Sequence, residues 1–286
     1  MISQMVREGN SVRVSPSVHL VPQPPGSREN ERAIALTQAP DTLRTLEEAR
    51  RWFEKGARKG YPPAQVNLAV LSLAGWGTPP NAGTALYWLR EAARQEYALA
   101  YFDLGILYLR GCGVRQDDHG AFSWFERGAN AGDTAAQVNL GYLYDQGLGV
   151  AQDRAQAAHW YRKAAESGAV QAQYNLADLY ARGEGVPLDE RLAFAWFQKA
   201  ALQGHTGARI LLGSLYAEGR GTEKDLPSAY AWLSAAALQG DDRGSAALRA
   251  LEQQLTPELL SQSRMRAQSL ARSPHLTSPS ELAFLH

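Results

Sequence analysis

The sequence predicts an all-α solenoid, in which two-helix units of one design are stacked side by side along the chain. The first observation is a period of 36 residues, which six of the seven tryptophans follow. The second is that alanine, leucine, tyrosine and glycine columns repeat with the same period. Periods of this length are typical of stacked supersecondary units, each of which buries its apolar face only against its neighbours. The six periodic tryptophans are Trp52, Trp88, Trp124, Trp160, Trp196 and Trp232.

The chain opens with a segment that follows no period. Residues 1–40 are polar and rich in proline, so we expect them to be disordered or loosely attached. They contain no apolar run long enough for a secretory signal, and no later segment reaches the ~20 apolar residues of a membrane span. The single cysteine, Cys112, excludes an intramolecular disulfide framework and fits a reducing compartment. We therefore expect a cytoplasmic protein that is not inserted in a membrane.

The repeat region is expected to span residues 41–240, with a lone first helix over about residues 41–59 and five helix pairs after it. In each pair the first helix, helix A, carries Ala, Leu and Tyr at spacings of four residues, which places an apolar stripe on one face. A glycine then stands where the end of a helix needs a left-handed backbone. These glycines are Gly75, Gly111, Gly147, Gly183 and Gly219, and a second glycine follows each of them two residues later.

The second helix of each pair, helix B, is expected to begin at an Asn or Asp whose side-chain oxygen caps the free N–H groups of the first turn. The helix then presents Ala, Trp and Ala at spacings of three and five residues. Small residues let the helices approach closely, and we expect the indole to fill the wedge where neighbouring pairs meet. The capping residues are Asn81, Asp117, Asp153, Asp189 and Asp225.

The C-terminal end departs from this pattern. Residues 241–272 are expected to form capping helices with a polar outer face, which the terminal unit of a solenoid needs. Thr256 and Pro257 have the residue types of an N-cap and of the first position of a final helix. Residues 273–286 are expected to be a flexible tail.

Two units carry a known repeat pattern in nearly complete form. They read AQVNLGYLYDQGLGVAQDRAQAAHWYRKAAESG and AQYNLADLYARGEGVPLDERLAFAWFQKAALQG. Over about residues 41–240 the chain resembles the Sel1-like repeat family, a branch of the tetratricopeptide-like α/α solenoids. The resemblance implies a right-handed superhelix whose concave face is lined by helices A. It also implies a family of adaptors, regulators and inhibitory partners, some of which neutralise toxic effectors in bacteria.

Composition and motifs argue against several other functions. Lys+Arg and Asp+Glu are balanced at 29 each, which disfavours a dedicated surface for nucleic acid. The glycine pairs lack the preceding strand and the further glycines of a phosphate-binding loop. His119, His159 and His205 fall at unrelated positions of the period, and no serine-nucleophile motif is present. We therefore expect no metal, no cofactor and no catalysis.

The candidate binding surface follows from the resemblance. In tetratricopeptide solenoids ligands lie along helix A, at positions next to the leucine column. The same positions here offer Asn amides, which bond a peptide backbone as donor and acceptor, together with aromatic rings and arginines that select carboxylates. Alternatively, the Asn residues bond between adjacent helices. The candidates are Asn67, Phe102, Asp103, Asn139, Tyr142, Tyr174, Asn175, Asp178, Arg110 and Arg182.

Trp76 is the seventh tryptophan and lies outside the period, between Gly75 and Gly77 in the first loop. A tryptophan in an exposed loop is often an anchor of an interface. The same side chain can instead cover the thin N-terminal end of the array, and the sequence leaves both interpretations open.

The expected function is that of a non-enzymatic interaction module, an adaptor, scaffold or regulator that binds a protein or an extended peptide in the concave groove. A monomer is the default state. One alternative is a dedicated inhibitory or immunity partner of one toxic effector, which predicts a single very tight complex. A further alternative is a hydrolase or a binder of cell-wall ligands that acts in the concavity.

Overall fold

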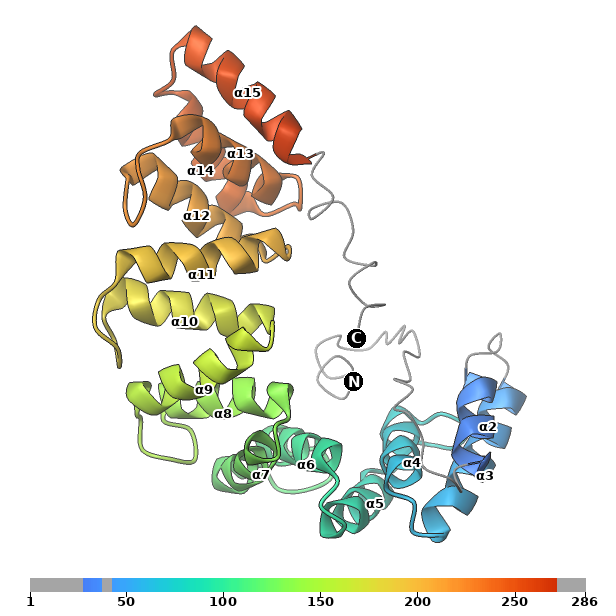
Figure 1. Ribbon diagram of the computed structural model, residues 1–286. Coiled ribbons are helices and arrows are strands. Elements are labelled where there is room, and N and C mark those ends of the chain that lie inside the picture. The colour runs from blue at the N-terminus through green and yellow to red at the C-terminus, as the bar shows by residue number, and fades with distance from the viewer. Residues whose placement is uncertain (1–27, 38–42, 272–286) are drawn as a thin grey trace. The chain divides into compact units, whose positions relative to one another are not determined.

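The computed structural model describes residues 28–37 and 43–271 of the chain. Within these residues every regular element is a helix, and the fourteen helices are labelled in Figure 1. The chain divides into two compact units, residues 1–151 (unit 1) and 152–286 (unit 2), and each unit is described by itself. The prediction of an all-α fold made of tandem helix pairs is confirmed.

The helices alternate along each unit between the two types that the sequence predicts. The helices of unit 1 are α2 (Arg28–Thr37), α3 (Leu43–Arg58), α4 (Pro62–Ala74), α5 (Ala82–Arg94), α6 (Ala98–Arg110), α7 (Asp118–Asn130) and α8 (Thr134–Gln146). The helices of unit 2 are α9 (Arg154–Glu166), α10 (Val170–Arg182), α11 (Glu190–Leu202), α12 (Thr206–Glu218), α13 (Leu226–Ala237), α14 (Asp242–Glu252) and α15 (Pro257–Ala271). Helices A are α4, α6, α8, α10 and α12, and helices B are α3, α5, α7, α9, α11 and α13.

Helices A and B of one pair pack against each other along their length, as α6 does with α7 and α12 with α13. Helix A ends at a glycine in the left-handed region, with φ between 68° and 73° at the five predicted positions. Helix B begins at the predicted Asn or Asp in every pair. Asn81 Oδ1, for example, accepts the N–H of Thr84 at 2.9 Å, and Asp189 Oδ1 accepts the N–H of Leu192 at 2.9 Å. Both cap predictions are confirmed.

The second glycine of each loop lies against the start of the preceding helix B. A Cβ atom on Gly149 would lie 2.2 Å from the carbonyl oxygen of Asp118, and one on Gly221 would lie 2.0 Å from that of Glu190. Gly149 also has φ 69°, a left-handed conformation that only glycine adopts at little cost. Since backbone meets backbone here, only a residue without a side chain fits. This contact fixes how closely consecutive pairs approach.

The most deeply buried column of large side chains on helix B is the one that follows the tryptophans. Trp160 and Trp232 are buried, whereas the other four periodic tryptophans are only partly buried. The expectation that the indole fills the wedge between pairs therefore holds only in part. The following residues are exposed by 3% at most, and they are Phe53, Leu89, Phe125, Tyr161, Phe197 and Leu233.

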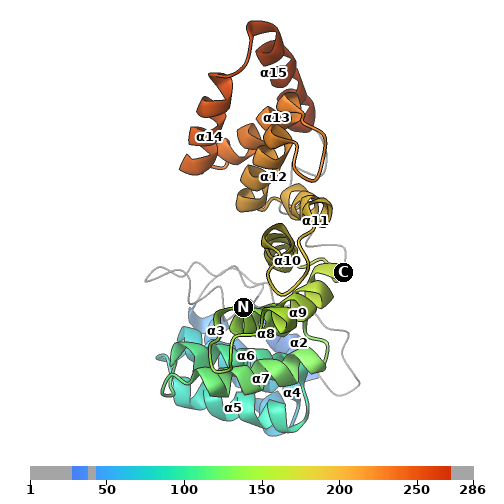
Figure 2. The same ribbon diagram turned by 90° about the vertical axis from the view of Figure 1, so that its left-hand side faces the viewer.

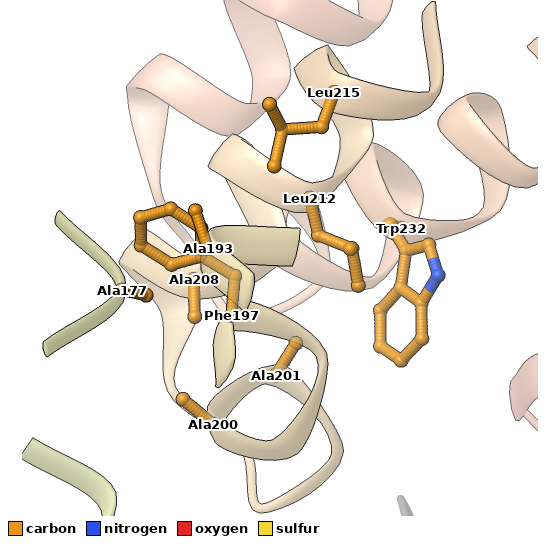
Figure 3. Packing of buried hydrophobic residues seen from close by; sticks show 9 residues of the cluster. All are labelled: Ala177, Ala193, Phe197, Ala200, Ala201, Ala208, Leu212, Leu215 and Trp232. Atoms are coloured by element: carbon orange, nitrogen blue, oxygen red, sulfur yellow. The ribbon is translucent and has the colours of Figure 1, made fainter. Parts of the chain in front are cut away.

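One cluster of unit 2 shows how the two columns share the core. Phe197 lies against Ala193 and Ala208, and Trp232 lies on the other side of Leu212 (Figure 3). On the outer side of four of the six tryptophans, a basic side chain three residues further along the helix covers the ring. Lys199 Nζ lies 3.9 Å from the centre of the Trp196 ring. The tryptophan thus lies at the boundary between core and solvent.

In three of the pairs a buried glutamine also joins helix A to the helix B before it. The side-chain amides of Gln65, Gln137 and Gln173 donate to Ala57, Ala129 and Ala165, at 3.2, 3.3 and 3.2 Å. These carbonyl groups lie in the last turn of helix B, where intrahelical partners are lacking. The buried glutamines therefore complete the hydrogen bonding of the helix ends.

Arg209 takes the place of the glutamine in α12. Its Nε donates to Ala201 O at 3.1 Å and its Nη1 to Ala235 O at 3.4 Å, and burial lowers the pKa of its guanidinium. Arginine has no acceptor, so Gln239 cannot bond to it as Gln203 does to Gln173. Gln239 donates instead to Gly204 O at 3.3 Å.

The expectation for the N-terminal segment is wrong for ten residues. Residues 28–37 form α2, which packs against α3 and buries Ala33 and Ile34 in one cluster with Phe53. Helix α3 is therefore not a lone first helix, because α2 pairs with it. The other residues of the segment 1–40 lie outside the described residues.

The two helices after residue 240 were expected and are present. Thr256 Oγ1 accepts the N–H of Leu259 at 3.3 Å, which makes Thr256 the predicted N-cap of α15. Helix α15 lies beside α13 in both views (Figures 1 and 2), and Leu260 and Ala267 pack on the cluster around Leu233. Residues 272–286, which include the expected flexible tail, lie outside the described residues. Among the described helices, none is long and apolar enough to span a membrane.

The two columns of helix B predict different costs of truncation. Phe125 is 0% exposed, so Phe125→Ala is expected to lower the free energy of unfolding by ~3–5 kcal/mol. Trp124 is partly buried, so Trp124→Ala is expected to cost less despite its larger volume. Urea unfolding followed by circular dichroism measures both. A larger loss for Trp124→Ala would contradict the assignment of the core column.

The glycine contact between pairs is tested by Gly149→Ala, with Gly132→Ala as its control. Both glycines have positive φ, 69° and 89°, but nothing lies within 4 Å of a Cβ on Gly132. The control is therefore expected to cost only the ~1–2 kcal/mol of a left-handed alanine. Gly149→Ala is expected to cost clearly more, because the new methyl group meets Asp118. Equal melting temperatures for the two variants would show that the close approach is not needed.

Candidate functional site

The predicted binding residues lie on helices A, and the two units present them separately. Unit 1 carries them on α4, α6 and α8, and unit 2 carries them on α10. The structure divides them into residues that the fold itself uses and residues that remain accessible.

The candidates on α4 and α6 are mostly used by the fold. Asn67 Nδ2 donates to Asn30 Oδ1 at 3.1 Å, which joins α4 to α2. Phe102 is 8% exposed and packs on Phe125, with ring centres 6.0 Å apart. Asp103 is 6% exposed. Of this group, only Arg110 at the end of α6 is exposed. Asn67 therefore follows the alternative in which the Asn residues bond between adjacent helices.

Asp103 is a buried carboxyl group. Burial raises its pKa to about 7, and the nearby carboxyl of Asp133 adds to the rise. Burial also raises the pKa of Asp133, although that carboxylate accepts the N–H of Ala136 at the start of α8. Both shifts mean that the folded chain disfavours the charged form. The equivalent position in α4, α8 and α10 is an uncharged Asn.

The candidates on α8 are more accessible. Tyr142 is 44% exposed, one of the few large hydrophobic side chains in the described residues to be so open. Asn139 lies one turn before it and is partly buried. Its amide donates to Ala135 O at 2.8 Å within its own helix, so it makes no bond between helices and its oxygen stays available.

On α10 the candidates form a polar strip on an aromatic base. Tyr174 is partly buried and stacks on His205 with ring centres 4.4 Å apart. Burial raises the pKa of the Tyr174 hydroxyl, and the carboxylate of Asp178 adds to the rise. Asp178 forms an ion pair with Arg182 at 3.0 Å, and Asn175 Oδ1 accepts from Gln171 at 2.8 Å. The structure thus places Tyr174, Asn175, Asp178 and Arg182 along one side of α10.

His205 was not among the predicted binding residues, yet it supports Tyr174. It is the N-cap of α12, and its Nδ1 accepts the N–H of Ala208 at 3.0 Å. Burial lowers the pKa of the imidazole, which keeps Nδ1 free to accept this bond. The period could have indicated this cap. Ala169, 36 positions earlier, and Asp241, 36 positions later, are also the residues that precede a helix.

Trp76 packs on the N-terminal cluster. It is partly buried and contacts the group of residues that contains Phe53 and Leu71. The covering role left open by the sequence is the one that the packing supports. Cys112 is partly buried and forms no disulfide. Among the described residues, no three His, Cys, Asp or Glu side chains gather as a metal site would require.

Comparison with known families identifies the repeats. The model of the Sel1 repeat matches residues 44–61, 62–97, 98–133, 134–168, 170–205 and 207–241. The first match corresponds to α3, and the other five each correspond to one helix pair, from α4 and α5 to α12 and α13. A search of the curated proteins finds no match.

Solved structures share the fold. A Sel1 repeat protein from Oxalobacter formigenes is 33% identical with a TM-score of 0.69, over 78% of this chain and 64% of that protein. The protein c5321, a protective antigen of uropathogenic Escherichia coli with an SLR fold, is 25% identical with a TM-score of 0.55, over 90% of this chain and 63% of its own. This chain therefore spans less than two thirds of either protein.

A third structure is an immunity protein, Pa5087 from Pseudomonas aeruginosa. It is 21% identical with a TM-score of 0.47, over 93% of this chain and 90% of that protein. A likeness at this level is too weak to transfer the role of that protein.

The buried carboxyl of Asp103 predicts a stability that depends on pH. Its pKa in the folded chain, about 7, lies above the ordinary value of 3.8. The free energy of unfolding therefore falls as the pH rises from 3.8 to 7. Asp103→Asn removes that loss and is expected to raise the free energy of unfolding by roughly 2–4 kcal/mol at pH 8. At pH 4.5 the gain is expected to be small. Urea unfolding at both pH values measures it, and equal effects at the two would refute the shifted titration.

Proposed function

The chain belongs to the Sel1 repeat family, and on that premise we propose that it is a non-enzymatic module that captures a protein or an extended peptide on its helices A. Sel1 repeats are protein-interaction modules. The observation that carries the proposal is Tyr142, which is 44% exposed on its helix A, whereas Leu140 and Leu143 of the same helix are 0% exposed.

On unit 1 the binding surface that we propose is centred on Tyr142 and Asn139. The two residues are three positions apart on α8, so their side chains lie on neighbouring turns of one face. Tyrosine is enriched at the centres of interfaces, because its ring buries a large area and its hydroxyl finds a hydrogen-bond partner. The free oxygen of Asn139 can accept an N–H of an extended peptide.

On unit 2 the proposed surface is the polar strip of α10. Tyr174 is held in place by its stack on His205, so binding a partner costs little side-chain entropy at this ring. Arg182 is 60% exposed and Asp178 is 29% exposed, and an ion pair this open contributes little to stability. The largely exposed guanidinium of Arg182 therefore remains available for a carboxylate on a partner.

The proposal leaves out the candidates that the fold uses. Asn67, Phe102, Asp103 and Trp76 are buried or bonded within the chain, so we assign them to stability. The remaining candidates of unit 1 are Arg110, Asn139 and Tyr142, and those of unit 2 are Tyr174, Asn175, Asp178 and Arg182. We also retain, as expectations, a monomer, a cytoplasmic location and no role in catalysis.

The experiment compares two exposed tyrosines of unit 1. Tyr142 lies on helix A and is 44% exposed, whereas Tyr87 lies on helix B and is 55% exposed. The partner is captured from the native host with the full chain and identified by mass spectrometry. Its affinity for the double variant Asn139→Ala/Tyr142→Ala is expected to fall at least about tenfold, as for a hot spot. Tyr87→Ala is expected to bind as the parent chain does.

Two outcomes would overturn the proposed surface. The first is unchanged affinity of the double variant with an unchanged circular dichroism spectrum. The second is loss of affinity in Tyr87→Ala alone, which would place the partner on helices B. A single partner that is bound very tightly would favour the alternative of a dedicated inhibitory or immunity protein over a general adaptor.

A further inference from the structure

A cavity of ≈ 340 Å³ lies between α11, α13 and α15, away from the proposed surface on helices A. This volume falls within the range of sites for small ligands. Its inner wall is formed by buried Trp232 and Ser228, and Arg266 and Ser269 of α15 are exposed at its edge. Helix α15 follows the repeats and is not part of their period. One side of the cavity is therefore formed by repeat helices and the other by α15.

The tryptophan of this cavity lacks the cation that covers four of the other five periodic tryptophans. Lys163 Nζ lies 4.4 Å from the centre of the Trp160 ring, and Lys199 covers Trp196 in the same way. At the equivalent position, three residues after Trp232, the chain has an alanine. The last indole of the array is therefore free of an internal cation–π partner.

The tyrosine of the cavity lacks its usual partner as well. In the preceding pair Arg162 donates to the hydroxyl of Tyr180 at 2.8 Å. The equivalent residues here are Gln198 and Tyr216, and both line the cavity. The charge of Arg266 of α15 lowers the pKa of the Tyr216 hydroxyl, against the larger effect of burial. Arg266 of α15 thus acts on Tyr216, whereas Tyr180 is bonded by Arg162, an arginine of the repeats themselves.

Hydrogen-bond donors outnumber acceptors in this cavity. Within the part of the chain that the structure describes, the side chains of Gln198, Tyr216, Trp232 and Arg266 hydrogen-bond to no protein group. An indole N–H and a guanidinium can only donate. No Asp or Glu lines the cavity. A ligand that supplies an acceptor can therefore bond to the indole N–H of Trp232 and to the guanidinium of Arg266.

The acidic side chain that acts on Tyr216 already accepts hydrogen bonds from its own helix. Asp225, the N-cap of α13, accepts the N–H of Ser228 at 3.0 Å and its hydroxyl at 2.6 Å. It therefore closes the hydrogen bonding of the lining serine and leaves Arg266 unpaired.

We propose that this cavity binds a small carboxylate that is attached to an apolar or aromatic group. The guanidinium of Arg266 pairs with the carboxylate, and Gln198 and the indole N–H of Trp232 donate to it from the wall. The apolar part of the ligand packs on Leu202 and Leu270, which also line the cavity. A single arginine suits the one charge of a carboxylate better than the two charges of a phosphate monoester. This site is independent of the proposed capture of a protein on helices A.

The probe for the experiment is phenylacetate, added to the full chain. The seven tryptophans give separate indole N–H signals in a ¹H–¹⁵N spectrum, and the variant Trp232→Phe assigns the one of interest. Phenylacetate is expected to shift the Trp232 signal in a saturable way. Phenylacetamide, which has the same shape and no charge, is expected to shift it far less.

Two arginines of α15 provide the matched variants. Arg266 lines the cavity, whereas Arg264 is exposed and does not line it. Arg266→Gln is expected to weaken binding of phenylacetate at least about tenfold, the loss of a charge-assisted hydrogen bond. Arg264→Gln is expected to bind as the parent chain does. The proposal is overturned if the Trp232 signal does not shift, if phenylacetamide binds equally well, or if both arginine variants weaken binding alike.

Discussion

The structure depends on a contact of backbone with backbone. In each loop the second glycine lies against the start of the preceding helix B, so near that a methyl group on Gly149 or Gly221 would overlap a main-chain carbonyl oxygen. This approach sets the separation of consecutive pairs. A glycine cap ends each helix A, and the side-chain cap that follows it begins the next helix B. The caps therefore place the helix ends where this separation requires them. The apolar columns fill the space that remains, and their identities vary where those of the glycines do not.

Much of the fold was predictable because one unit is repeated. A cap or glycine that is ambiguous in one copy becomes certain when five copies share it, and every predicted cap is present. The errors fall where that redundancy is missing. Helix α2 does not follow the 36-residue columns and has only a short apolar face around Ala33 and Ile34, so its packing on α3 left no pattern. The core column after the tryptophans was also missed. Phe, Leu and Tyr alternate there, so the pattern preserves burial but not identity, whereas the rarer tryptophans stand out while being less buried.

The candidate site shows a different limit. The sequence placed Asn67, Asn139 and Asn175 at one position of the repeat, and they have three different bonds. Asn67 reaches across to Asn30, Asn139 bonds within its helix, and Asn175 accepts from Gln171. Which of them stays available depends on the neighbouring helix, and for Asn67 that neighbour is the helix the sequence did not reveal. The accessible residues on α8 and α10 are therefore those left over once the fold has satisfied its own polar groups. Helix α15 adds a comparable case, because the donors that face it have lost the partners that the earlier pairs provide.

The substitution of Arg209 for a glutamine limits how the units can be exchanged. A glutamine at this position both donates and accepts, so a unit that carries it fits beside any neighbour that offers a helix end and an amide. Arg209 needs carbonyl groups on two sides, and it obliges Gln239 to bond elsewhere. In a unit placed before a neighbour whose glutamine donates, as Gln203 does to Gln173, an arginine at this position would leave that amide without its acceptor. The chain is thus periodic in its backbone, whereas the side chains that join α12 to α13 are specific to their place in the array.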